Sequence, residues 1–220
     1  MKATIASLIF LLLSLAVSSQ TYKYIGIEEG LSNQKIYRIQ KDARGYMWFL
    51  THVGIDRYNG KEIKHYKLKE GDRELDPLLN INWTYLDKTG TLLVTGKQGR
   101  IFRYDSGHDR FVQIYSMYNY WNKDYHAFVR YSYIDQESNV WLCDKSAIHL
   151  FNIESGQKQR ISNRLGNITC IEQINSEHFF IGTDKRIYLV KLENGNLKEL
   201  SCGKLEMMDM HVHELYLHRT

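Results

Sequence analysis

The sequence has 220 residues, of which 43% are hydrophobic and 25% are charged, and this composition excludes an intrinsically disordered chain. The net charge of +4 is spread along the chain without a basic block, which argues against a nucleic-acid partner. The three cysteines, Cys143, Cys170 and Cys202, lack the spacing of a metal site. They lie in apolar runs, so we predict small buried side chains.

Residues 1–19 are typical of a secretory signal peptide. Lys2 precedes an apolar stretch at 8–17, and Ser18 and Ser19 supply the small residues of a cleavage site before Gln20. The alternative is a transmembrane anchor, but the stretch is shorter than the roughly 20 apolar residues that span a bilayer. No cysteine for lipid attachment lies near the cleavage site. We therefore predict a soluble mature protein in the periplasm or outside the cell.

The chain after residue 20 is predicted to be all-β. Short apolar runs are separated by Gly, Asn and Asp, and Pro77 is the single proline. The first such segment, 36–66, divides into four predicted strands, at 36–40, 46–51, 54–58 and 62–66.

Two turns carry the polar signals of this segment. Asp42 can bond its own backbone and Gly45 can adopt positive φ, so together they predict a tight turn between the first two strands. Asn59-Gly60 predicts a type I′ hairpin turn, with positive φ at both residues, between the last two strands. DSG at 105–107, ESG at 154–156 and ENG at 193–195 occupy the same position in later segments.

The segment 36–66 recurs at 82–115, 129–161 and, with less similarity, 168–200. Six positions after Asp42, Asp87 and Asp135 stands a large apolar residue, and these residues are Trp48, Leu93 and Trp141, with Phe180 as the equivalent in the fourth copy. A spacing of about 40 to 50 residues is the size of one four-stranded propeller blade. We predict a β-propeller domain at 20–220 built of four-stranded antiparallel blades, at about 31–68, 78–117, 127–162 and 166–201.

A large apolar residue at one position of every repeat indicates packing between neighbouring blades. The alternative is that Trp48 and Thr51 form a ligand platform, but the recurrence favours packing. The residues assigned in this way to the structure of the repeat are Asp42, Gly45, Trp48, Thr51, Gly54, Tyr58, Asp87, Gly90, Asp135 and Trp141.

Residues 206–220 are predicted to begin a fifth blade, which makes the chain an incomplete ring with two open strand edges. The alternative is a small ring of four blades closed by its own ends. His211 and His213 would share one face of a strand and could bind a metal, but no carboxylate partner is fixed nearby. We favour an exposed strand face and predict no metal site.

The segment 115–128 breaks the repeat and is the candidate binding loop. Aromatic rings that can stack on sugars stand beside amide and charged groups that can bond hydroxyls, and loops of this kind usually carry function. The predicted ligand-binding residues are Tyr118, Tyr120, Trp121, Asn122 and Tyr125. The alternative is an aromatic segment folded onto its own blade or forming a strand.

Residues 31–60 carry a family resemblance. Leu31, Ser32, Asp42, Gly45, Trp48, Thr51, Gly54, Arg57 and Tyr58 fit the pattern of the two-component regulator propeller repeat. The match is strong over 31–66, fair over 78–161 and faint after 166. The chain thus resembles the N-terminal part of the periplasmic sensor region of the hybrid two-component histidine kinases of Bacteroidetes.

This resemblance implies a non-enzymatic propeller that senses an oligosaccharide derived from a degraded glycan. Its partners would be that ligand and the remainder of the sensor chain, which carries the histidine kinase and an inner-membrane anchor, with a homodimer formed through the full-length protein. No catalytic motif or cofactor fingerprint is found in the sequence, so we predict no catalytic residue and no cofactor. The alternatives are a secreted glycan lyase or hydrolase, which needs a paired acid and base, and a plain interaction scaffold.

Overall fold

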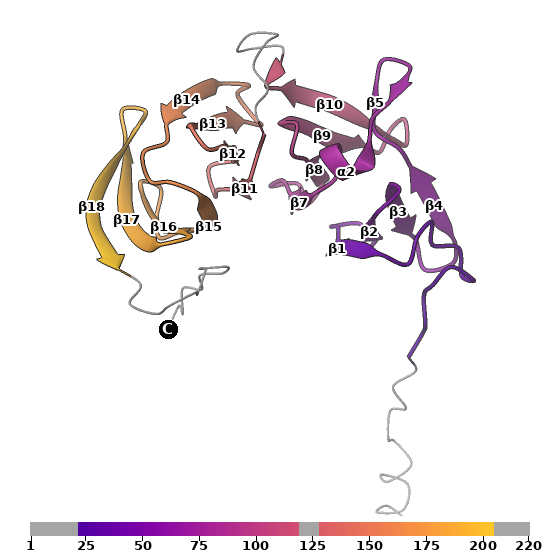
Figure 1. Ribbon diagram of the computed structural model, residues 1–220. Coiled ribbons are helices and arrows are strands. Elements are labelled where there is room, and N and C mark those ends of the chain that lie inside the picture. Colours follow the sequence, from indigo (N-terminus) through magenta and orange to yellow (C-terminus); the bar gives the residue numbers. More distant parts are fainter. Residues whose placement is uncertain (1–21, 119–127, 205–220) are drawn as a thin grey trace, which may run out of the picture.

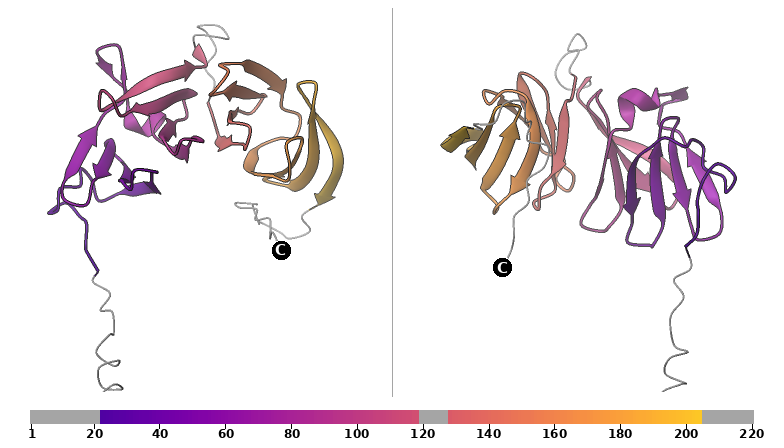
Figure 2. Two further views of the ribbon diagram at one scale, coloured as in Figure 1. Left: turned by 180° about the vertical axis from the view of Figure 1, so that it is seen from behind. Right: turned by 60° about the horizontal axis from the view of Figure 1, so that its bottom comes forward.

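The computed structural model describes residues 22–118 and 128–204. Within these ranges the chain forms four four-stranded antiparallel sheets in which consecutive strands are neighbours. The sheets stand side by side as the blades of an open arc, with their first strands on the concave side (Figure 1, Figure 2). The prediction of an all-β propeller is confirmed, and the described blades do not close into a ring of four.

The strands of each blade follow the repeat. Blade 1 consists of β1 (Ile36–Lys41), β2 (Met47–Thr51), β3 (Ile55–Tyr58) and β4 (Ile63–Tyr66). Blade 2 consists of β7 (Trp83–Leu86), β8 (Leu92–Thr95), β9 (Arg100–Asp105) and β10 (Arg110–Ser116). Blade 3 consists of β11 (Tyr131–Ile134), β12 (Asn139–Cys143), β13 (Ala147–Asn152) and β14 (Lys158–Ser162). Blade 4 consists of β15 (Ile168–Gln173), β16 (His178–Thr183), β17 (Arg186–Glu193) and β18 (Asn196–Lys204).

The connection between blades 1 and 2 holds a small hairpin, β5 (Lys69–Glu70) and β6 (Arg73–Glu74), followed by the short helix α2 (Pro77–Asn80). Asp76 caps this helix, because its Oδ1 accepts a hydrogen bond of 2.9 Å from the Leu78 amide. A Cβ on Gly96 would lie 2.3 Å from the Cα of Asn80. The helix therefore lies directly against the turn between β8 and β9.

In blades 1 to 3 the turn between the first two strands is held by an aspartate carboxylate, whereas in blade 4 it is held by the side-chain oxygen of Asn175. Asp42 Oδ1 accepts hydrogen bonds from the amides of Arg44 and Tyr46 at 2.9 and 3.0 Å, and Gly45 has a φ of 86°. In blade 3 the residue equivalent to Gly45 is Ser138, which adopts a φ of 69°. The same turn geometry is thus reached with and without glycine.

The type I′ turn predicted at Asn59-Gly60 is wrong, although the hairpin itself forms. Gly60 has a φ of 97°, whereas Asn59 is not among the described residues with positive φ. The reason is that Asn59 Oδ1 accepts hydrogen bonds of 2.9 Å from the amides of Lys61 and Glu62, which makes Asn59 the start of a longer turn. The two-residue turn occurs instead in blade 4, where Asn194 and Gly195 have φ values of 47° and 76°.

The hydrophobic core lies between the blades. Trp48 is fully buried and packs with Leu50 against Leu92, Val94 and Tyr104 of blade 2. Trp141 is likewise fully buried, and its ring lies 4.8 Å from that of Phe179 in blade 4. Successive side chains of a strand point to opposite faces of the sheet. In the second strand of a blade, every other residue therefore faces the preceding blade, and the residues between them face the next blade.

Two further expectations concern residues at the ends of the chain and the cysteines. The predicted signal peptide, 1–19, and the predicted start of a fifth blade, 206–220, lie outside the described residues. Cys143 and Cys170 are buried as predicted. Cys202 is exposed, contrary to the prediction, because it lies on β18, the outermost strand of blade 4.

Candidate functional site

One face of the arc carries both the turns between second and third strands and the connections between blades. In an antiparallel sheet of four consecutive strands, the start of the first strand, the turn after the second and the end of the fourth lie at the same edge. We call this edge of the four blades the connection face, formed by residues 52–54, 67–82, 96–99, 117–118, 128–130, 144–146, 163–167 and 184–185. The predicted binding loop joins blades 2 and 3 and so belongs to this face by topology.

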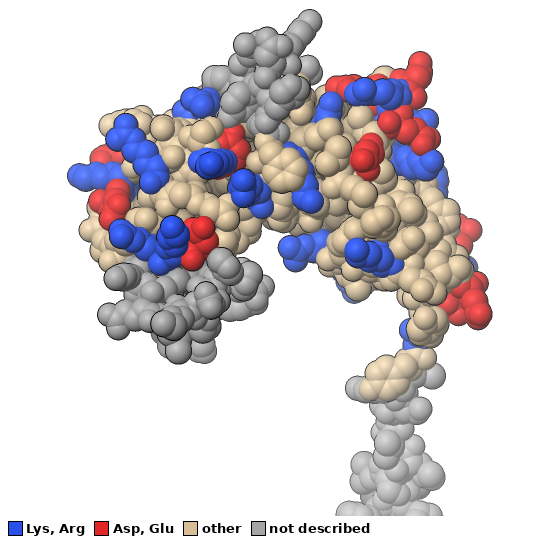
Figure 3. Space-filling model, viewed as in Figure 1, with Lys and Arg blue, Asp and Glu red and all other residues tan. Residues whose placement is uncertain are grey.

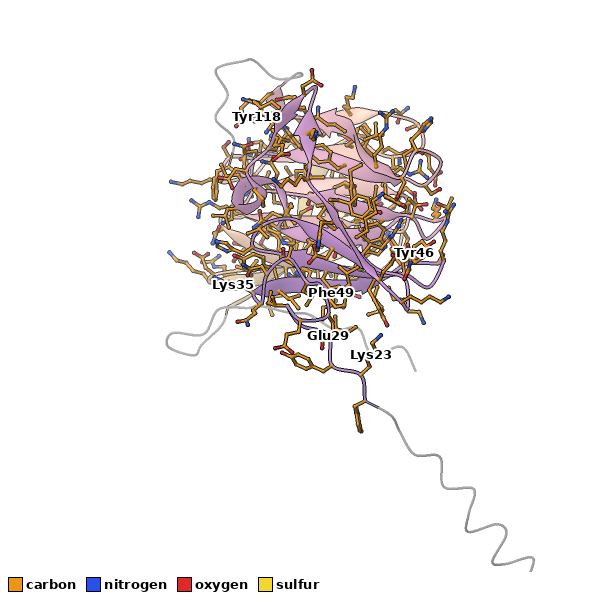
Figure 4. All side chains as sticks on the ribbon, turned by 90° about the vertical axis from the view of Figure 1, so that its right-hand side faces the viewer. Lys23, Glu29, Lys35, Tyr46, Phe49 and Tyr118 are labelled. Carbon is orange, nitrogen blue, oxygen red and sulfur yellow. The ribbon has the colours of Figure 1, made fainter. Side chains whose placement is uncertain are left out.

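Both described ends of that loop lie against basic side chains. The Arg100 guanidinium lies 5.1 Å from the centre of the Tyr118 ring, and the Lys97 ammonium lies 5.7 Å from that of Phe128. Met117 is buried, and a Cβ on Gly99 would lie 2.1 Å from its sulfur. Figure 4 shows Tyr118 at the opposite end of the molecule from Lys23 and Glu29. The other predicted ligand-binding residues, Tyr120, Trp121, Asn122 and Tyr125, lie outside the described residues.

Arg100, whose guanidinium faces the Tyr118 ring, connects the elements around this end of the loop. It is buried, donates to Gln98 Oε1 and forms an ion pair of 3.3 Å with Glu70 Oε2 of the small hairpin. Its guanidinium also lies 3.4 Å from Asn80 Oδ1 at the end of α2. The hairpin, the helix and the first end of the loop are therefore joined through one side chain.

A second feature of the connection face is a pocket of about 650 Å³ between blades 3 and 4. It is lined by five basic residues and one carboxylate, together with Leu165, Gly166, Asn167, Thr183 and Tyr188. The basic residues are Arg130, Lys145, Arg164, Lys185 and Arg186, and the carboxylate is Asp184. Figure 3 shows that Lys and Arg side chains gather over blades 3 and 4. We call this feature the basic pocket.

None of these five cations forms an ion pair with another residue in the described part of the chain. Arg130 stands two residues after Phe128, so the basic pocket begins where the predicted binding loop ends. The pocket could not be predicted from the sequence, because its cations come from separate turns and form no motif.

The turns that carry these cations are held by local side-chain hydrogen bonds. Thr183 Oγ1 accepts from the Arg186 amide at 3.0 Å, and Asp144 Oδ1 accepts from the Ala147 amide at 2.6 Å. Asn163 donates from Nδ2 to the carbonyl of Gly166 at 2.8 Å and accepts at Oδ1 from the Leu165 amide at 3.0 Å. The backbone of the pocket is thus fixed while its basic side chains remain exposed.

Asn167 adds a polar group of another kind. Its Oδ1 is buried, and no donor within the described residues reaches it. A buried acceptor without a donor is costly, so this oxygen is an unsatisfied polar group of a residue that lines the pocket.

A groove of about 610 Å³ on the convex side, between β4 and β10, also contains basic residues, but its electrostatics differ. Its Lys64 is paired with Asp109, and its Lys67 is paired with Glu74. With two of its four cations paired and two carboxylates in its lining, the groove offers less charge to a ligand than the basic pocket.

Asp109 is the centre of a cluster that joins blades 1 and 2. It accepts hydrogen bonds from Arg57 Nη1 at 2.9 Å and Tyr66 Oη at 2.6 Å, as well as from Lys64 and Tyr104. Burial opposes its ionisation, but these hydrogen bonds and the Arg57 charge hold the pKa of Asp109 well below its usual range. Burial and the bond to Asp109 raise the pKa of Tyr66. We call these five residues the Asp109 cluster.

A Ser, an Asp and a His also meet in blade 1, which bears on the enzyme alternative. Asp56 is fully buried; its Oδ2 accepts from Ser32 Oγ at 2.9 Å and its Oδ1 lies 2.8 Å from His65 Nδ1. The serine and the histidine thus bind opposite oxygens of one carboxylate, whereas a nucleophile needs a direct bond to its base. The network instead attaches the segment before β1 to blade 1.

Within the described residues, no group of three or more His, Cys, Asp or Glu side chains could hold a metal ion. In the same two ranges, no helix has the length and apolar character that crossing a bilayer requires.

The first blade carries the sequence signal that identifies the repeat. Residues 30–52 match the family model described as two component regulator propeller. The predicted resemblance is thereby confirmed over the first repeat, which includes Leu31, Ser32 and the turn and strand around Asp42 and Trp48. No curated protein matches the chain in sequence.

Solved structures share the fold at low sequence identity. The extracellular domain of the putative hybrid two component system BT3049 from B. thetaiotaomicron superposes with a TM-score of 0.62 at 18% identity. The match covers 81% of this chain and 26% of that one. PorZ, described as an essential bacterial surface component of the type-IX secretion system of Porphyromonas gingivalis, has a TM-score of 0.55 at 14% identity. That match covers 81% of this chain and 24% of PorZ. The chain thus spans about a quarter of the length of these two structures.

Proposed function

We propose that this chain is the N-terminal, ligand-sensing part of the periplasmic sensor of a hybrid two-component system. The observation that carries the proposal is the connection face, where the described ends of the predicted aromatic loop and the basic pocket both lie, on a propeller whose first blade matches the regulator family. The proposed ligand is an oligosaccharide derived from a degraded glycan. The proposed output is a histidine kinase in the remainder of a longer chain.

The proposal includes export by the predicted signal peptide, anchoring of the longer protein in the inner membrane and a homodimer formed through it. The likeness to the extracellular domain of a hybrid two component system supports this placement, because that domain has the same fold over most of this chain. The described part of the propeller is proposed to be non-catalytic, which the arrangement of Ser32, Asp56 and His65 supports.

The test is oligosaccharide binding measured by calorimetry on the complete extracellular region that includes this chain. Tyr120→Ala and Trp121→Ala are expected to weaken binding by about two- to tenfold each, since one stacked ring is worth about 0.5 to 1.5 kcal/mol. The matched control is Tyr24→Ala, which removes an exposed aromatic ring before blade 1 and should leave the affinity unchanged. Unchanged affinity in both loop variants would remove the loop from the site. A lack of any saccharide binding would favour the scaffold instead.

A further inference from the structure

The basic pocket between blades 3 and 4 has a charge pattern that needs a partner. Five cations line it against one carboxylate, and none of the five is paired within the described residues. Like charges around one concavity repel one another, and a bound anion relieves that repulsion. The paired lysines of the groove between β4 and β10 show that this chain elsewhere neutralises its pocket cations with carboxylates of its own.

The size of the pocket narrows the class of anion. A volume of about 650 Å³ lies within the range of small-molecule sites and exceeds the needs of one inorganic ion. Asn167 and Tyr188 also line the pocket, but Asn167 Oδ1 is buried and Tyr188 packs in the core between blades 3 and 4, so the exposed cations supply the contacts that a ligand can make. The proposed function supplies the saccharide, and the five cations specify its acidic groups.

We propose that the basic pocket binds a small acidic saccharide, whose carboxylate or sulfate groups are held by the basic side chains. Lys145, Arg164 and Lys185 come from three turns around the pocket, so an anion at its centre can be reached from three sides. The inference names the ligand class of the connection face and therefore rests on the proposed function.

The experiment is calorimetry on the complete extracellular region with four probes: a uronic-acid disaccharide, a sulfated disaccharide, a neutral disaccharide and inorganic phosphate. At least one acidic disaccharide is expected to bind about tenfold or more tightly than the neutral one, because charge-assisted hydrogen bonds are about twice as strong as neutral ones. Raising the salt concentration should weaken binding of the acidic disaccharide but not binding of the neutral one.

Two variants separate the pocket from general charge. The double variant Arg164→Gln with Lys185→Gln is expected to bind the acidic disaccharide about tenfold or more weakly than the wild type. The control is Lys41→Gln with Arg44→Gln, which removes the same charge from exposed residues at the opposite edge of the sheets and should change the affinity by less than about twofold.

Several outcomes would overturn the inference. Equal affinity for the neutral and both acidic disaccharides would refute the acidic ligand, and phosphate binding as tight as either acidic disaccharide would refute the saccharide. An equal loss in the pocket and control variants would place the site elsewhere. These results leave the sensor proposal standing when a saccharide still binds, whereas binding of no saccharide refutes both.

Discussion

At the scale of single residues, the aspartate that begins each repeat acts on the turn and on the core at once. Asp42 and Asp135 each accept a hydrogen bond of 2.8 Å from the indole nitrogen of the tryptophan six positions later. Asp87 has Leu93 at that position, and its free oxygen instead contacts Arg103, directly across from Leu93 on β9, at 2.6 Å. The second oxygen of the aspartate is therefore bound by a hydrogen bond from tryptophan in blades 1 and 3 and by an ion pair with arginine in blade 2.

The glycines of these turns give a prediction with an internal control. Gly45 and Gly90 hold equivalent positions with φ values of 86° and 73°, so alanine at either costs about 1 to 2 kcal/mol of backbone strain. A Cβ on Gly45 would meet nothing within 4 Å, whereas a Cβ on Gly90 would lie 2.3 Å from Ala43 Cβ of blade 1. We expect Gly90→Ala to reduce the free energy of unfolding by about 1 kcal/mol more than Gly45→Ala in urea denaturation. Equal losses would show that blades 1 and 2 do not touch at this turn.

At the scale of elements, blades 1 and 2 are joined by the Asp109 cluster on the side of β3, β4 and the turn before β10. The Arg57 side chain is 13% exposed and Asp109 is 37% exposed, so water screens the pair in part. Double substitution, Arg57→Gln with Asp109→Asn, measured with both single variants, is expected to give a coupling energy of about 1 kcal/mol. Lys67→Gln removes a more exposed pair with Glu74 and serves as the control, with a loss below about 0.5 kcal/mol.

The same cluster gives a prediction about pH. The pKa of Asp109 is lower in the folded protein than its ordinary value of 3.8, so the folded state holds the ionised form more strongly. Its stabilisation is present above that ordinary value and is lost as the pH falls through the lower folded value. The difference in unfolding free energy between the wild type and Asp109→Asn should be constant from pH 5 to pH 8 and shrink below about pH 4. A difference that shrinks already near pH 6 would contradict this assignment.

The strands could be predicted because their signals are local and repeated. In blade 1 every predicted strand lies within one residue of the observed one, since Asp42, Gly45 and Gly54 mark the boundaries. The hairpin β5–β6 and helix α2 were not anticipated, because they occur once and their residues carry no repeat. The turn at Asn59 was misassigned, because its side chain competes with the backbone for the amides of Lys61 and Glu62.

The candidate site was only partly predictable, for a different reason. The sequence directs attention to the loop after Tyr118, where aromatic residues interrupt the repeat. The basic pocket depends on cations that are scattered between Arg130 and Arg186 and converge only when blades 3 and 4 stand side by side. Arg57 and Asp109 are likewise 52 positions apart, so their contact needs the arrangement of blades 1 and 2.

At the scale of the whole molecule, each blade contacts its neighbours in the arc through an interface that we call a joint. The free energy of unfolding should therefore be approximately a sum of contributions from the joints. Trp48 lies in the joint of blades 1 and 2, and Trp141 in that of blades 3 and 4. We expect Trp48→Phe and Trp141→Phe each to cost about 2 kcal/mol and the double variant to lose the sum within about 0.5 kcal/mol. The losses caused by Trp48→Phe and Asp42→Asn should be less than additive in the double variant, because each substitution removes the same hydrogen bond. Strong coupling between the two tryptophans would show that distant joints are linked.

The alternation of side chains along each second strand gives every blade two different faces. In blade 2 Leu92 and Val94 meet blade 1, while Thr95 bonds Ser132 of blade 3 at 3.1 Å. A whole blade inserted between two others would present the matching face to each neighbour. Duplication in frame of the DNA for one such unit therefore makes one joint identical to a joint of the parent protein and one new joint between the same two kinds of face.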